Sequence, residues 1–166
     1  SRKHPFTKAS PGDPMFGKPY SEYVRYQMPF LIATTVIGLA RLGLSLGGQP
    51  NSVVKYFSMT VVGFIGIFYY ALTVRRSGFG TYKHMIPMIF NQGMIAHIIA
   101  VIGIALSANG HPNVFDAPEF RGPGDTSQVT PMTHALAHIF LGSWAGTLVG
   151  WIVGCVVMAV GGGRKK

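Results

Sequence analysis

Residues 85–107 read MIPMIFNQGMIAHIIAVIGIALS, a stretch that contains no Asp, Glu, Lys or Arg. A helix needs about 20 mostly apolar residues to cross the hydrocarbon layer of a membrane. Three further apolar stretches lie at 29–46, 53–74 and 132–160. Because none of them alternates strictly between apolar and polar residues, we expect helices rather than barrel strands. The sequence therefore predicts an all-α integral membrane bundle of four transmembrane helices.

The composition agrees with a membrane protein and excludes several other classes. Hydrophobic residues make up 48% of the chain and charged residues only 11%, whereas about a quarter of the residues in a soluble domain are charged. A single cysteine excludes an internal disulfide framework. No carboxylate lies within the four stretches, so the acidic relays that are common in proton pumps are missing. We expect a protein that is not an enzyme and has no catalytic residues.

The chain divides into three parts. A cytoplasmic arm is expected at 1–28, the four-span membrane domain at 29–160 and a basic cytoplasmic tail at 161–166. The first residues are too polar for a signal peptide. Three tyrosines spaced three residues apart predict a short interfacial helix at 20–28, because amphipathic rings favour the headgroup region of a membrane; they are Tyr20, Tyr23 and Tyr26.

The basic residues indicate the orientation. Lys and Arg number fourteen against five Asp and Glu, which gives a formal net charge of +9. Five of the fourteen lie in the arm, three in the loop between the second and third spans, and three in the tail, so eleven share one side of the membrane. Short basic loops stay in the cytoplasm. We therefore expect both termini inside a bacterial-type inner membrane, with the charge serving orientation and lipid contact rather than nucleic acid binding.

Glycines recur at intervals of four in the last span, at Gly142, Gly146, Gly150 and Gly154. Small residues at this spacing let two helix backbones approach closely, which stabilises helix pairs in lipid. The four glycines are therefore predicted to be helix-packing residues. A groove for a lipid, a pigment or a cofactor is the alternative.

His97 lies near the middle of the third span, where an ionisable side chain is costly and indicates function. Gly93 and Ala100 leave space beside it for a flat group, so haem b or a chlorophyll-type pigment is a candidate cofactor. The alternative is a hydrogen bond across helices. Asn91 and Gln92, about one turn earlier, favour an interhelical polar network.

His134 and His138 stand four residues apart, so both imidazoles leave the same face of a helix. Such a pair can share a metal ion, but no third ligand is defined by the sequence, so we expect no metal site. His138 is expected about 5 to 15 Å closer to the outer boundary than His97. That offset argues against a haem held between the two histidines, although both remain candidate cofactor-binding residues together with His134.

Arg41 lies within the first span and can extend its side chain toward the outer boundary. With His134 and His138 it is a candidate for binding an acidic headgroup or a haem propionate. Pairing with Asp116 or Glu119 of the outer loop is the favoured alternative.

In size and number of spans, the chain is similar to cytochrome b-type anchor subunits of respiratory complexes. That similarity is architectural only. We expect a non-catalytic subunit that packs in and stabilises a larger membrane complex, most readily a respiratory or photosynthetic electron-transfer assembly. Its partners would be other membrane protein subunits and lipids. The alternatives are a haem- or pigment-binding electron carrier that uses His97, and a small transporter or lipid-handling protein.

Overall fold

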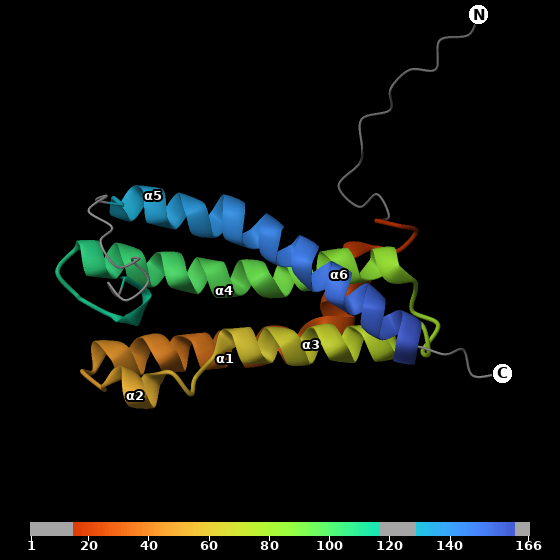
Figure 1. The fold of residues 1–166 in the computed structure, drawn as a ribbon, viewed down its shortest axis with the longest axis horizontal. Helices are drawn as coiled ribbons and strands as arrows, with labels where there is room; N and C mark the ends of the chain where they lie inside the picture. The colour runs from red at the N-terminus through yellow and green to blue at the C-terminus, as the bar shows by residue number, and fades with distance from the viewer. Residues whose placement is uncertain (1–14, 117–128, 162–166) are drawn as a thin grey trace, which may run out of the picture.

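The computed structural model describes residues 15–116 and 129–161 (Figure 1). The rest of the predicted arm, most of the tail and the loop segment that contains Glu119 lie outside the described residues. Every regular element in the described ranges is a helix, which confirms the all-α prediction. The elements are α1 (Tyr20–Leu46), α2 (Asn51–Val54), α3 (Met59–Thr73), η1 (Tyr82–His84), α4 (Met85–Ala108), η2 (Val114–Asp116), α5 (Pro131–Leu136), the π-helical η4 (Ala137–Gly142) and α6 (Ser143–Gly161).

Among the described residues, four helical stretches are long and apolar enough to span a membrane. They cover Tyr20–Leu46, Asn51–Thr73, Tyr82–Ala108 and Pro131–Gly161, with mean hydropathy between 1.5 and 1.9. This confirms the predicted bundle of four spans and identifies an integral membrane protein. The second span is interrupted rather than continuous, because α2 ends at Val54 and α3 begins at Met59.

The predicted interfacial helix does not exist as a separate element. Residues 20–28 form the first turns of α1, which continues through Pro29 to the end of the span. The reason is tertiary contact on both sides of the proline. Tyr26 packs on an aromatic ring of the loop after α3, and Phe30 packs on a ring of α3, with centroids 4.3 and 5.1 Å apart. These contacts bind the helix to the rest of the bundle on both sides of the proline.

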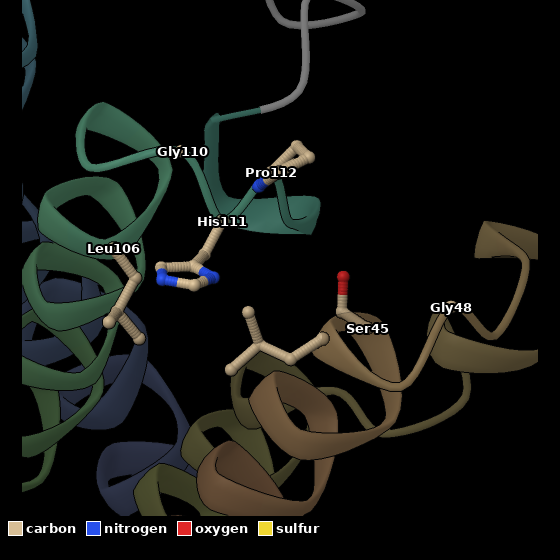
Figure 2. A pocket seen from close by; sticks show the side chains of 7 residues that line it. Ser45, Gly48, Leu106, Gly110, His111 and Pro112 are labelled. Carbon is tan, nitrogen blue, oxygen red and sulfur yellow. The ribbon is translucent and has the colours of Figure 1, made fainter.

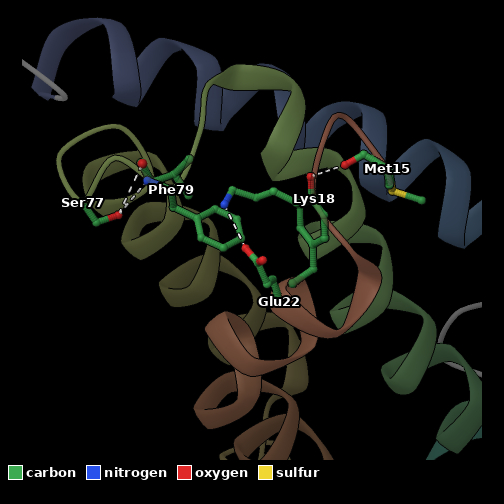
Figure 3. A network of polar contacts seen from close by, with 7 residues as sticks. Met15, Lys18, Glu22, Ser77 and Phe79 are labelled. Atoms are coloured by element: carbon green, nitrogen blue, oxygen red, sulfur yellow. Dashed lines mark hydrogen bonds and ion pairs between the residues drawn. The ribbon is translucent and has the colours of Figure 1, made fainter. Parts of the chain in front are cut away.

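The segment before α1 is tied to the helix ends by polar and aromatic contacts (Figure 3). Lys18 forms an ion pair with Glu22 at 2.8 Å, and its ammonium lies 4.8 Å from the centre of the Phe79 ring. The Tyr23 hydroxyl donates to the carbonyl oxygen of Met15 at 2.8 Å. Part of the predicted arm is therefore held against the bundle.

Helix α4 is central and packs against α1, α3 and α6 (Figure 1). Both ends of the described chain lie at one end of the bundle, which we call the terminal end; the opposite end is the loop end. One cluster of buried side chains lies in the terminal half of the bundle, where α1, α3, α4 and α6 all meet. They are Tyr23, Ile67, Tyr70, Ala71, Val74, Met85, Met88, Ile89 and Met158.

A buried polar network crosses the bundle around Gln92 of α4. Its amide nitrogen donates to Thr34 Oγ1 at 3.1 Å and to the Val62 carbonyl oxygen at 3.2 Å, and its amide oxygen accepts from the Tyr70 hydroxyl at 3.3 Å. Gly66 lies against the amide, so that a side chain at this position would collide with it. The predicted interhelical polar network is confirmed, and it joins α1, α3 and α4.

Candidate functional site

His97 of α4 and His138 of η4 face each other across the helix pair. Their Nδ1 atoms are 3.0 Å apart and their ring centroids 5.3 Å apart. Both side chains are partly buried. The expected offset of about 5 to 15 Å between them is wrong. This pair is the candidate functional site.

The offset is absent because of where the two helices end. His97 lies eleven residues before Ala108, which corresponds to about 16 Å along α4, and His138 lies seven residues after Pro131, about 10 Å along the last span. α5 therefore begins about 6 Å closer to the terminal end than the point where α4 stops. The long connection between α4 and α5 allows this shift. The sequence-based estimate counted residues from the ends of the spans, so it could not include this shift.

The π-helical segment turns His138 toward α4. Residues of α6 that face the bundle interior include Ser143 and Thr147. His138 lies five residues before Ser143. If the helix between them were a regular α-helix, the His138 side chain would point about 140° away from the interior face on which Ser143 lies. A π-turn advances by about 82° per residue, which reduces the difference to about 50°. The Ser143 hydroxyl donates to the His138 carbonyl oxygen at 3.3 Å, across the widened turn.

Gly142 lets the last span approach His97. A Cβ at this position would lie 2.7 Å from Cε1 and 3.1 Å from Nε2 of the His97 ring. Gly150 faces Ile67 and Ile89, and Gly154 faces Met85. Gly146 has nothing within 4 Å, so it points away from the other helices. Three of the four predicted packing glycines therefore line contacts within the chain, and Gly146 does not.

His134 borders the pair without completing a metal site. Its ring centroid lies 5.0 Å from that of His138. Within 15–116 and 129–161, no group of three His, Cys, Asp or Glu side chains is placed to hold one ion. The site therefore offers two imidazoles directly, with the third one turn nearer the loop end.

Arg41 is placed apart from the histidines. Its guanidinium lies 5.5 Å from the centre of the Phe115 ring, and Phe115 packs over Gly103 of α4. Gly103 is six residues beyond His97, or about 9 Å further toward the loop end. The predicted pairing of Arg41 with Asp116 rests on a side chain that lies outside what the structure describes. Glu119, the other expected partner, also lies outside the described residues.

A hollow lies at the loop end, between the end of α1 and the turn after α4 (Figure 2). Ser45 and His111 both line it. Residues 43–47 read GLSLG, which matches the Gly-x-Ser-x-Gly pattern of a nucleophile elbow. That pattern needs a turn between a strand and a helix, whereas Ser45 lies in the last turn of α1 and its Oγ accepts from the Val114 amide at 2.8 Å. The serine therefore caps η2, and the histidine pair stays the stronger candidate.

No protein-family model matches this chain, and neither does any curated protein or solved structure. Its function is therefore inferred from its own geometry.

Proposed function

We propose that this chain is a non-catalytic integral membrane subunit that packs in and stabilises a larger membrane complex of the electron-transfer type. The observation that carries the proposal is the environment of the histidine pair. The loop-end part of the last span, α5 with η4, has no buried residue among its own and packs against α4. His134 and His138 lie on this thinly covered segment at membrane depth.

Polar side chains facing lipid are unfavourable, and ionisable residues within spans almost always face a protein interior or a water-filled cavity. A neighbouring subunit over η4 would cover the histidines. η4 and the start of α6 present large apolar side chains that suit helix packing: Phe140, Leu141 and Trp144 are 63%, 70% and 64% exposed. Gly146, one turn further on, leaves its side of the helix open to close approach by another backbone.

The distribution of charge supports an orientation with both termini in the cytoplasm of a bacterial-type cell. Basic residues concentrate at the terminal end of the bundle, and short basic loops remain on the cytoplasmic side. Among the described residues, two basic side chains lie toward the loop end, Arg41 and Lys55. Five lie at the terminal end: Lys18, Arg25, Arg75, Arg76 and Lys83.

The proposal is tested by position-specific photo-crosslinking in native membranes. A crosslinking amino acid replaces Leu141 on η4 or, as the control, Ile32 on α1, which is 56% exposed. We expect a stoichiometric protein adduct at Leu141, co-migration of the chain with the same protein in native gels, and lipid adducts alone at Ile32. A chain that migrates alone and forms only lipid adducts at both positions would refute the proposal.

A haem held between the two Nδ1 atoms of His97 and His138 does not fit the distance. An iron between two imidazoles on opposite sides needs two bonds of about 2.0 Å, so the nitrogens would be about 4 Å apart. The observed separation is 3.0 Å. A pigment on a single histidine is tested by the absorption spectrum of the purified protein with and without His97→Ala.

A further inference from the structure

We propose that His97 and His138 form a binding site for a divalent transition-metal ion of the Zn²⁺ and Cu²⁺ class, held through the two Nδ1 atoms. Imidazole nitrogens are preferred ligands of these ions. The two rings come from different helices, and their Nδ1 atoms are 3.0 Å apart. The site is separate from the subunit role and would exist in the isolated chain.

The separation of the nitrogens matches two neighbouring ligands of one ion. Two metal–nitrogen bonds of about 2.05 Å that meet at 90° to 110° place the nitrogens about 2.9 to 3.4 Å apart. The observed 3.0 Å lies within that range. The Nδ1 separation is too short for an iron between two opposite Nδ1 ligands, and it suits an ion with two adjacent ligands.

Binding needs no change in the net charge of the pair. In the ion-free protein one Nδ1 carries the hydrogen and donates it to the lone pair of the other Nδ1. When the ion binds, that hydrogen moves to Nε2 of the same ring, and both Nδ1 lone pairs face the metal. Both imidazoles stay neutral, which is the form that binds metals.

The surroundings preorganise the pair. Gly142 lies directly against the His97 ring, so the ring is held from one side. The Ser143 hydroxyl bridges the His138 carbonyl oxygen at 3.3 Å and the Met94 sulfur at 3.9 Å. The π-turn that aims His138 at α4 is a rare conformation that occurs frequently at functional sites. These features maintain the two-ligand geometry in the absence of an ion.

The outward side of the pair is left open by this chain. His138 lies about 10 Å from the loop end of the last span, and η4, which carries it, has no buried residue. Because the described part of the chain does not cover this side, water or a ligand from a partner would complete the coordination of the ion.

The test uses the full chain, purified in detergent with an affinity tag that contains no histidine and stripped with a chelator. Zn²⁺ is titrated by calorimetry, and Cu²⁺ is followed by electron paramagnetic resonance, which counts coordinated nitrogens. The variants are His97→Gln and His138→Gln, which keep a polar side chain at each position, and their double variant. The matched control is His111→Gln, an exposed histidine of the loop end.

We expect one equivalent of ion per chain and two imidazole nitrogens in the Cu²⁺ spectrum. Each single variant should lower the affinity at least tenfold, since even loss of an outer hydrogen-bond partner costs about 10- to 100-fold, and should leave one nitrogen. The His111 variant should match the wild type. Far-ultraviolet circular dichroism and gel filtration check folding, and the wild-type spectrum alone decides the number of nitrogens if a variant unfolds.

The proposal is overturned if the wild type binds no ion, or if the double variant binds as the wild type does. It is also overturned if the wild-type spectrum shows fewer than two nitrogens. None of these results bears on the subunit proposal, which is decided by crosslinking in native membranes. A chain that binds the ion but migrates alone would refute the subunit role and leave the metal site standing.

Discussion

Replacing Gly142 with alanine is expected to destabilise the bundle, whereas the same replacement at Gly146, one turn further along the helix, is not. A methyl group at Gly142 would lie 2.7 Å from Cε1 of His97, but a methyl group at Gly146 would meet nothing within 4 Å. Ordinary van der Waals contact begins at 3.4 Å, so the ring would have to move by about 0.7 Å. Such a movement strains the contact with His138.

The difference between the two variants isolates this contact. Alanine is favoured over glycine in a helix by up to about 1 kcal/mol, and this gain is shared by both variants. Overpacking costs about 1 to 3 kcal/mol, and weakening the bond between the histidines costs about 0.5 to 1.5 kcal/mol. Gly142→Ala should therefore be about 1.5 to 4.5 kcal/mol less stable than Gly146→Ala.

The assay is reversible unfolding of the purified protein in mixed micelles, with circular dichroism as the readout and the free energy of unfolding as the result. Gly146→Ala should be as stable as the wild type or slightly more stable. Equal free energies for the two alanine variants, or a less stable Gly146 variant, would refute the close approach of the last span to His97.

Gln27→Met is expected to raise the free energy of unfolding by about 1 kcal/mol, because both amide atoms of this fully buried side chain have no hydrogen-bond partner; a loss of stability would contradict this. Gln92→Leu should lower it by about 2 kcal/mol, since the buried Tyr70 hydroxyl loses its acceptor; an unchanged value would show that the network contributes nothing. In a cysteine-free background, a cysteine at Ser52 should react with an impermeant maleimide in intact cells, and one at Ser77 only after permeabilisation. The reverse pattern would overturn the proposed orientation.

The spans were predictable because a membrane selects helices by length and composition. The stretch at 85–107 corresponds to α4, which runs from Met85 to Ala108. In contrast, the sequence did not predict that residues 20–28 belong to the same helix as the first span. A proline at position 29 favours a helix boundary, but contacts of the flanking aromatic rings with other elements carry α1 through it.

The sequence also identified the candidate residues, because their types are unusual within a membrane span. It did not reveal how these residues are arranged in space. An intramembrane histidine stands out in any apolar span, so His97 was recognisable. Its partner was not, because the depth of His138 depends on where α5 begins and its direction depends on a π-turn. Neither has a signature in the sequence. The glycine repeat likewise does not reveal that Gly146 faces outward, since the repeat drifts by about 40° per step around the helix.

The sequence by itself determined the class of molecule: four apolar stretches, a surplus of basic residues on one side, and few polar groups inside the membrane. Those properties follow from transfer free energies, which are sums over residues and need no tertiary structure. Only the tertiary structure decided that His97 and His138 meet at 3.0 Å. A contact between helices depends on the rotation and offset of each helix, and these are decided by packing, by a widened turn and by the length of a loop.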